Sequence, residues 1–479
     1  MKLGEIVRRL ESQVIHPIAA ENVADREPLG YSIDSRTLRK GELFFAIRGE
    51  THDGHRFVAD ALEKGAMAVV VSAEFLSSPD AGALSMNRAK LIPVADTLVA
   101  LQLLASSVLR SWSGRVVAIT GSMGKTTTKE MAAAVLARVG RVIKTEGNLN
   151  NAFGLPLSIL KMESDGAHAS DFDLAVLEMG MNHKGELCEL TRIAPPDLGV
   201  VTNVAAVHLE AFSSIDEIAA AKSELIAGIK SGGAAVLNAD DDRVMRMRTM
   251  RSDLRYHTFG IDRAADVAAR EVRAEGLERT SFVLATRAGE AKVSLPLAGR
   301  HNVYNALAAA AIGDFCGASP EAIASALALS SSPKMRGQVY RLGGGITLVD
   351  DSYNSNPSAL LEMVATVCAN RDYKRRVVVA GEMLELGSTA PELHREAGRR
   401  IVALGAGVLI GVRGFALEIV AGAREAGMSE DAALFCDSPE TAAELVERIA
   451  LPGDVILVKG SRGVKTEIIV ERLKREMAG

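Results

Sequence analysis

The stretch VVAITGSMGKTTTKEMAAAVLARVG, residues 116–140, constrains the fold more than any other part of the sequence. Its first four residues form an apolar run that is typical of a buried strand, and residues 127–139 have the spacing of an amphipathic helix. Gly121 and Gly124 permit the tight turn between the two. A strand that passes through a short turn into a helix predicts an α/β domain with a mostly parallel sheet.

The same turn has the chemistry of a phosphate-binding site. The helix begins at the loop, so unpaired backbone N–H groups and the positive end of the helix dipole face it. Lys125 adds a positive charge, and the hydroxyl of Thr126 is a ligand suited to Mg²⁺. The strict P-loop pattern requires glycine where this chain has Ile119, so the loop is a variant. A glycine-rich turn with a solvated lysine is the alternative. The predicted phosphate site consists of Gly121, Ser122, Met123, Gly124, Lys125, Thr126 and Thr127.

Composition excludes several classes of partner. Charged residues make up 24% of the 479 residues, and the net charge of -5 leaves no basic surface for nucleic acid or anionic membranes. No apolar run approaches the ~20 residues that span a bilayer, and the amphipathic N-terminus does not resemble a signal peptide. The four cysteines lack paired or metal-type spacing. We expect a soluble cytoplasmic protein whose partners are small molecules.

The pattern of strands and helices divides the chain into three α/β domains. Residues 1–85 form a small α/β unit that ends at a Ser- and Pro-containing segment, and residues 86–112 are expected to be a linker. In residues 113–315 strands alternate with helices, with an antiparallel insertion near 250–300. The alternation restarts in the C-terminal part, residues 316–479, which predicts a third, Rossmann-like domain.

Polar residues follow the predicted strands. Ligands of open α/β sheets bind beyond the carboxyl ends of the strands, and these ends carry Glu178, His208, Asp350, Asp351 and Lys459. Each residue alone is equally typical of a cap or a solvated loop. Beside a phosphate-binding turn, Glu178 and His208 are candidate Mg²⁺ ligands, although Mg²⁺ prefers oxygen to nitrogen.

Lys222 lies in the middle of an apolar helix face. Ser214 and Glu217 predict a capping box at the start of this helix. A buried ammonium costs several kcal/mol unless it is paired, neutralised or able to reach water with its tip. A snorkelling lysine and a chemically altered lysine therefore both remain open. The apolar stripe around it consists of Ile215, Ile218, Leu225, Ile226 and Ile229.

Motifs along nearly the whole chain resemble those of the Mur ligase family. They are TGSMGKTTTKE, EGNLNNAFGLPLSIL, LEMGMNHKGELCELTRIAPPD, LAGRHNVYNALAAAA, PKMRGQVYRL, DDSYNSNPSAL and VKGSRGVKTE. The P-loop, the DDSYNSNP segment and GEMLELG are most similar to members that add D-alanyl-D-alanine. Members that add the third peptide residue usually carry Thr-Asn in the P-loop, where this chain has Ser122-Met123, and an Asp-Asn-Pro-Arg motif that it lacks. Ala211 replaces a glycine expected in HLEAF, a minor departure.

The resemblance implies a reaction. An N-terminal domain would hold a UDP sugar, a central domain would bind ATP, and a C-terminal domain would close over both. ATP would phosphorylate the carboxylate of UDP-N-acetylmuramoyl-tripeptide, and the amine of D-alanyl-D-alanine would attack the acyl phosphate. The resemblance also implies a monomer in peptidoglycan precursor synthesis. Whether the third peptide residue is diaminopimelate or lysine cannot be read from the motifs.

The resemblance also assigns roles to residues. Thr126 would bind one Mg²⁺, and Glu178, His208 and a carbamylated Lys222 a second, while Lys125 neutralises phosphate. Asn302 and Asn305 would approach the adenine, and Arg336 and Asp351 the phosphates and ribose. The residues expected to bind the UDP sugar and the peptide are Ser32, Asp34, Ser35, Arg36, Asn148, Asn150, Asn151 and Lys459.

Four other functions share part of this pattern. They are the third-residue-adding Mur ligases, a folylpolyglutamate-type ligase, a plain P-loop kinase or ATPase, and a nucleotide switch without catalysis. A kinase or ATPase needs no uridine-binding domain, and a folylpolyglutamate-type ligase is not expected to carry SIDSRTLRKGELFFAIRGE. A switch has no use for a pocket that accepts an amine.

Overall fold

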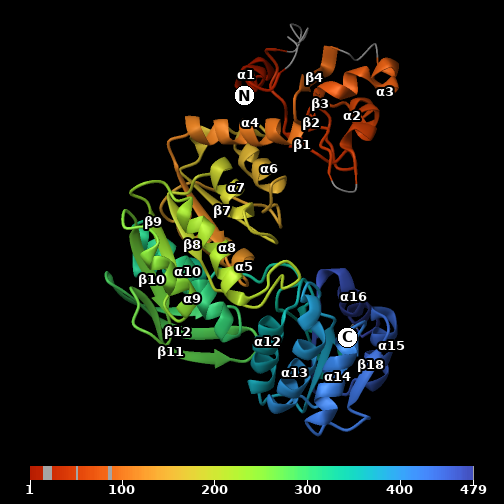
Figure 1. Cartoon of the computed structure of the whole chain (residues 1–479). Helices are drawn as coiled ribbons and strands as arrows, with labels where there is room; N and C mark the ends of the chain where they lie inside the picture. Colours follow the sequence, from red (N-terminus) through yellow and green to blue (C-terminus); the bar gives the residue numbers. More distant parts are fainter. Residues whose placement is uncertain (15–23, 50–51, 85–88, 478–479) are drawn as a thin grey trace.

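The computed structural model contains three sheets that follow one another along the chain (Figure 1). It describes residues 1–14, 24–49, 52–84 and 89–477. No helix in these ranges has the length and apolar character needed to cross a membrane. The sheets are parallel or mostly parallel and are packed with helices, so the predicted α/β fold is confirmed.

The first sheet is fully parallel, with the strand order β1-β2-β3-β4. Its strands are β1 (Tyr31–Ser32), β2 (Leu43–Phe45), β3 (Ala68–Ser72) and β4 (Leu91–Val94). The helices of this part are α1 (Leu3–Arg9), α2 (Val58–Glu63), α3 (Pro79–Ala83) and α4 (Thr97–Ser111). In Figure 1, α4 lies between this sheet and the rest of the molecule.

The structure does not bear out the linker expected at residues 86–112. Apart from residues 85–88, which lie outside the described ranges, this segment is strand β4 and the 15-residue helix α4. Leu91 and Ile92 pair with β3 and are buried. Leu101 and Leu104 of α4 lie in a core that joins the first sheet to the central domain. Since β4 is a strand of the first sheet and α4 packs in a core with that sheet, the segment belongs to the N-terminal domain and is not a linker.

The central sheet has the order β13-β12-β11-β10-β9-β8-β5-β7-β6. Its strands are β5 (Arg115–Thr120), β6 (Val142–Lys144), β7 (Leu174–Glu178), β8 (Leu198–Val201), β9 (Ala234–Asn238), β10 (Arg255–Gly260), β11 (Val267–Glu275), β12 (Arg279–Thr286) and β13 (Gly289–Leu295). The antiparallel insertion is confirmed for β11 to β13, whereas β10 pairs in parallel with both of its neighbours.

Helices cover both faces of this sheet. Val117 and Ile119 of β5 pack in one core with α5, and Val116 and Ala118 pack in the other with α8. The alternation follows from the two-residue period of a strand. The helices are α5 (Lys125–Leu136), α6 (Gly154–Leu160), α7 (Glu186–Ile193), α8 (Ile215–Ala227), α9 (Asp242–Arg246), α10 (Arg300–Phe315) and α11 (Pro320–Leu327).

The central domain extends beyond the predicted boundary at residue 315. Helix α11 packs against α5 and β13, and its Ile323 and Leu327 belong to the same core as α5. The boundary therefore lies between the end of α11 and the start of β14 at Gln338. The sequence alone did not reveal this because α11 is a short helix that follows a turn, as a first helix of a new domain would.

The C-terminal sheet has the order β14-β15-β19-β16-β17-β18, with only β14 antiparallel. The strands are β14 (Gln338–Arg341), β15 (Thr347–Asp351), β16 (Arg375–Gly381), β17 (Val408–Val412), β18 (Ala433–Cys436) and β19 (Asp454–Lys459). The helices are α12 (Pro357–Ala369), α13 (Ala390–Ala403), α14 (Ala416–Glu425), α15 (Pro439–Ile449) and α16 (Glu467–Glu476).

Candidate active site

The loop between β5 and α5 requires both of its glycines. Gly121 has φ +153° and Gly124 has φ +79°, backbone conformations that favour glycine. A Cβ on Gly124 would lie 2.1 Å from Oδ1 of Asn305, and one on Gly121 would lie 1.9 Å from Oγ1 of Thr202. Gly124 caps α5, so the first N–H groups of the helix open onto the loop. The loop is a preorganised anion site.

Residues at the end of β8 hold the loop in place. The amide of Met123 donates to Oδ1 of Asn203 (2.9 Å), and Oγ1 of Thr202 donates to the carbonyl of Met123 (2.7 Å). The amide of Ser122 donates to the carbonyl of Asn203 (3.0 Å). Thr202 and Asn203 were missed by sequence reasoning, although both directly follow the apolar run of β8.

Lys125 folds back over the loop. Its Nζ donates to the carbonyl of Gly121 (2.7 Å). Burial lowers the pKa of Lys125, the positive charge of Arg336 lowers it further, and the carboxylate of Glu178 opposes both effects. An incoming phosphate would replace the carbonyl as the partner of Nζ and would favour its charged form.

Glu178 stands at the carboxyl end of β7 and is 2% exposed. Its Oε1 accepts a hydrogen bond from Nδ2 of Asn150 (2.8 Å), but its Oε2 is buried without a hydrogen-bond donor. Nζ of Lys129 lies 4.0 Å away. A buried carboxylate oxygen without a donor is costly unless a cation binds to it.

Lys222 is 1% exposed on α8, so its side chain is not extended along the surface as that of a snorkelling lysine would be. Within the described residues it has no hydrogen-bond or ion-pair partner. Burial, assisted by the charge of Lys125, holds the pKa of Lys222 well below its usual value. Oγ of Ser214 caps α8 by accepting from the amide of Glu217 (3.2 Å), but the predicted capping box is not closed, because Oε2 of Glu217 accepts from the amide of Ser213 (2.9 Å). The lowered pKa makes the amine of Lys222 easier to deprotonate than that of an exposed lysine.

His208 lies in the loop between β8 and α8 and has φ +54°. Its Nδ1 is 2.5 Å from Oε2 of Glu385, a residue of the C-terminal domain. The hydrogen bond lowers the pKa of Glu385, which keeps this carboxylate ionised at neutral pH. Sequence reasoning missed Glu385 as a site residue, although it lies in the GEMLELG motif.

The C-terminal domain contributes charged groups to the same cleft. The guanidinium of Arg336 lies 4.1 Å from the centre of the Tyr353 ring. Asp351 and Lys459, at the ends of the paired strands β15 and β19, form an ion pair of 2.6 Å. Lys459, predicted as a substrate residue, is thus engaged by Asp351.

Helix α10 contributes two amides and a histidine. Asn305 lies against Gly124 and bonds Thr128 (3.3 Å) and Asn302 (3.2 Å). Nδ1 of His301 is buried without a partner, and burial lowers the pKa of His301 to about 4. His301 was also missed, because a histidine at a helix start has no distinctive sequence signal.

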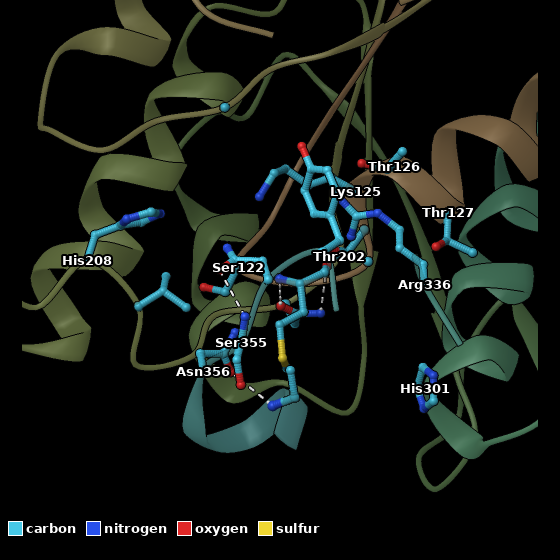
Figure 2. Close-up of a pocket in the computed structure, with 18 of the residues that line it drawn as sticks. Ser122, Lys125, Thr126, Thr127, Thr202, His208, His301, Arg336, Ser355 and Asn356 are labelled. Atoms are coloured by element: carbon cyan, nitrogen blue, oxygen red, sulfur yellow. Dashed lines mark hydrogen bonds between the residues drawn. The ribbon is translucent and has the colours of Figure 1, made fainter. Parts of the chain in front are cut away.

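A single cleft of about 980 Å³ brings most of the predicted residues together. Figure 2 shows His208 on one side of this cleft and Arg336 and His301 on the other, with Ser122 between them. The predicted residues that line it are Ser122, Met123, Gly124, Lys125, Thr126, Thr127, Asn148, Asn150, Asn151, Glu178, His208, Asn302, Asn305, Arg336, Asp351 and Lys459. Gly121 and Lys222 are not among the lining residues.

The N-terminal candidates do not line this cleft. Oδ1 and Oδ2 of Asp34 accept hydrogen bonds from Arg36 (2.7–3.2 Å), and Oγ of Ser32 bonds the backbone of Asp34. Ser35 is buried, and its carbonyl accepts from Lys64 (2.9 Å). These contacts are those of a folded turn. Asn151 likewise caps α6 through the amide of Gly154 (2.9 Å).

The described residues contain no group of three or more His, Cys, Asp and Glu side chains arranged to hold a metal ion. A cation in this cleft would therefore need other oxygens as well, from Thr126, from phosphate or from a modified lysine. The unpaired Oε2 of Glu178 fits such a cation, because a carboxylate oxygen is the ligand that Mg²⁺ prefers.

Comparison with known families identifies the relatives of this chain. Models described as the Mur ligase family catalytic domain, the Mur ligase middle domain and the Mur ligase glutamate ligase domain match residues 29–108, 119–313 and 335–462. The chain belongs to the Mur ligase family.

Relatives of this Mur ligase match it over nearly its whole length. It is 34% identical to the UDP-N-acetylmuramoyl-tripeptide–D-alanyl-D-alanine ligase of Bacillus subtilis over 93% of both chains. Among solved structures, MurF from Acinetobacter baumannii superimposes with a TM-score of 0.85 at 29% identity and covers 98% of both chains. MurF from Thermotoga maritima, solved with ADP, has a TM-score of 0.79 at 29% identity over 93% of this chain and 97% of that one.

Proposed function

We propose that this Mur ligase joins D-alanyl-D-alanine to UDP-N-acetylmuramoyl-tripeptide and uses ATP to activate the tripeptide carboxylate. The observation that carries the proposal is the P-loop with Lys125, which opens into a cleft shared by the central and C-terminal domains. The full-length similarity to tripeptide–D-alanyl-D-alanine ligases supplies the substrates. The proposed enzyme acts as a monomer, since the residues that line the cleft come from two domains of the same chain. ATP and UDP-linked precursors place the reaction in the cytoplasm.

The reaction needs activation because a carboxylate is a poor electrophile. Transfer of the γ-phosphoryl group of ATP to the tripeptide carboxylate forms an acyl phosphate and ADP. The amine of D-alanyl-D-alanine then attacks the acyl carbon, and phosphate leaves as the amide bond forms and the amine loses a proton. The task of the protein is to position the reactants and to neutralise charge.

The residues of the cleft are arranged for these steps. The N–H groups at the start of α5 and Nζ of Lys125 bind the β- and γ-phosphates. Arg336 and Asp351 approach the nucleotide from the C-terminal domain, which brings the third domain to the reacting groups. Asn302 and Asn305, next to Gly124, contribute to the nucleotide site.

Magnesium would be held by Thr126 at one position and by Glu178, His208 and carbamylated Lys222 at the other. When bound, it neutralises the phosphate oxygens during transfer. The Oε2 of Glu178, which has no hydrogen-bond donor, and the lowered pKa of the buried Lys222 amine support this assignment. Carbamylation would turn the Lys222 amine into an anionic oxygen ligand.

Phosphate release by the purified chain with ATP and Mg²⁺ tests the function. Release is expected only when UDP-N-acetylmuramoyl-tripeptide and D-alanyl-D-alanine are both present. Release without either substrate would indicate a plain ATPase. Release with a dipeptide precursor and a single amino acid would indicate a third-residue-adding ligase, and release with folate and glutamate a folylpolyglutamate-type ligase. With tripeptide and ATP alone, borohydride should trap the acyl phosphate as a reduced muramoyl product.

A further inference from the structure

The loop that carries His208 rests directly on the C-terminal domain. Besides the contact between His208 and Glu385, the amide of Glu210 donates to the carbonyl of Glu385 (3.1 Å). Gly387 packs so closely that a Cβ there would lie 3.1 Å from the carbonyl of Leu209. His208, a predicted Mg²⁺ ligand from the central domain, is thus contacted by a loop of the C-terminal domain.

The C-terminal loop is itself fixed in place. The amide of Met383 donates to Nε2 of the fully buried His394 (2.9 Å), and the amide of Leu384 donates to Oγ of Ser461 (2.9 Å). Glu385 has φ +65°, a conformation that a non-glycine residue keeps only when its surroundings enforce it. His208, with φ +54°, is in the same region. His208 and Glu385 thus meet across the interface with both backbones in the left-handed region, which is uncommon for non-glycine residues.

The chemistry of the pair fixes which nitrogen of His208 is free. An ionised carboxylate can only accept a hydrogen bond, so Nδ1 of His208 must carry the proton. In a neutral imidazole, Nε2 then holds the lone pair. The His208 side chain is 20% exposed and lines the cleft, and its Nε2 has no hydrogen-bond partner among the described residues. Histidines that bind metals commonly donate their other N–H to a carboxylate in this manner.

We propose that Glu385 is a positioning residue that acts across the domain interface: it fixes the tautomer and orientation of His208 and so prepares Nε2 to bind magnesium. Docking of the C-terminal domain and completion of the second metal position are then a single event. The inference rests on the proposed role of His208 as a magnesium ligand. It explains why a carboxylate of the third domain reaches a loop of the second.

Manganese binding tests the proposal separately from catalysis. Mn²⁺ replaces Mg²⁺, and its electron paramagnetic resonance signal counts bound ions in the presence of a non-hydrolysable ATP analogue. Glu385→Ala is expected to weaken the second Mn²⁺ about 10- to 100-fold, and Glu385→Gln, which keeps one acceptor oxygen, should weaken it less. Glu392→Gln is the matched control, because Glu392 is an exposed glutamate of the same domain that also pairs with a basic side chain, that of Arg399 (3.3 Å). It should bind Mn²⁺ like the wild type.

A double-mutant cycle separates positioning from a purely structural link. If Glu385 acts through His208, Glu385→Ala should not weaken Mn²⁺ binding further in a His208→Ala background. Unchanged Mn²⁺ affinity in Glu385→Ala, with a raised KM for ATP, would overturn the proposal and leave a structural interdomain contact. Unchanged Mn²⁺ affinity in His208→Ala would instead remove its premise, whereas failure of ligation by the wild type would refute the proposed function itself. Thermal unfolding of each variant checks that it is folded.

Discussion

Two buried lysines lie on helices that cover opposite faces of the central sheet, and their surroundings differ completely. Lys129 on α5 is fully buried, and its Nζ donates to the carbonyls of Thr145 (2.7 Å) and Gly147 (3.3 Å) and lies 3.1 Å from Oε1 of Glu130. Lys222 on α8 is equally buried and has no partner among the described residues. Lys129 therefore has the contacts of a structural lysine, whereas Lys222 does not.

The difference shows that burial alone does not reveal what a lysine does. Oxygens around Lys129 offset the cost of removing an ammonium from water. Around Lys222 no oxygen among the described residues does so, and burial holds the pKa of its amine well below the usual value. A neutral amine can add carbon dioxide to form a carbamate, which is an oxygen ligand for a cation. The partnerless lysine is therefore the one with a chemical role.

Lys125 is the reference for Lys129 and Lys222, because its side chain lines the cleft and does not lie in a hydrophobic core. Lys125→Ala should lower ligation activity by about 10³-fold, because it removes a charge that is needed in the transition state. Its melting temperature should stay close to that of the wild type. Steady-state phosphate release and thermal unfolding provide the measurements, and a loss of activity below about tenfold would refute the role.

Lys222→Ala should lower activity by about 10²- to 10³-fold if the carbamate is a ligand. Bicarbonate or a short carboxylic acid should partly restore the activity, since an oxygen ligand can then occupy the vacated space. Lys222→Arg should not be rescued, because its side chain still fills the site. A crystal with bound magnesium that showed a bare amine, together with an active Lys222→Ala variant, would exclude carbamylation.

Lys129→Met should act on stability instead of chemistry. It leaves the carbonyls of Thr145 and Gly147 without their donor, while Glu130 keeps its pairing with Lys144, and this should cost about 2–4 kcal/mol of unfolding free energy. Short carboxylic acids should not restore any activity that the Lys129→Met variant has lost. A Lys129→Met variant that was as stable as the wild type, yet inactive and rescued by acetate, would reverse the assignment of the two lysines.

The sequence predicted the alternation of strands and helices in the central and C-terminal domains, and the P-loop, because these depend on local patterns. Strand β5, both glycines and the start of α5 lie within a few residues of one another. It did not predict β4 and α4 as part of the first domain, since only their burial against residues far along the chain reveals that role.

For the same reason, the sequence could not predict which residues contact each site residue. Asn203, Glu385 and Lys129 gain their roles from contacts with residues that are distant in the chain. The apolar residues around Lys222 in the sequence did predict that this lysine is unusual. Whether its amine had a partner depended on what packs against α8, which periodicity does not report.

Substitution of Asp351 tests whether the C-terminal domain contacts the nucleotide. Its ion pair with Lys459 orients both side chains in the cleft. Asp351→Ala should raise the KM for ATP about tenfold, equivalent to about 1.4 kcal/mol, with a smaller effect on kcat. ATP kinetics that matched the wild type would mean that only the central domain binds ATP.

His301 extends the comparison to a histidine whose buried Nδ1 has no partner and which needs no modification, because imidazole is readily neutral. Its pKa of about 4 in the folded protein lies below the usual 6.5, so the unfolded chain binds more protons between these values. Stability must therefore fall as the pH drops from about 6.5 toward about 4. At pH 5 this one group should account for up to about 2 kcal/mol of the loss.

His301→Gln removes this titration and keeps a polar side chain of similar length. Between pH 7 and pH 5 its melting temperature should fall by several degrees less than that of the wild type. Only the two pH differences are compared, so an overall change in stability caused by the substitution does not affect the test. Equal decreases in both proteins would show that His301 is charged or solvated in the folded state, and that a buried nitrogen without a partner does not by itself identify a neutral group.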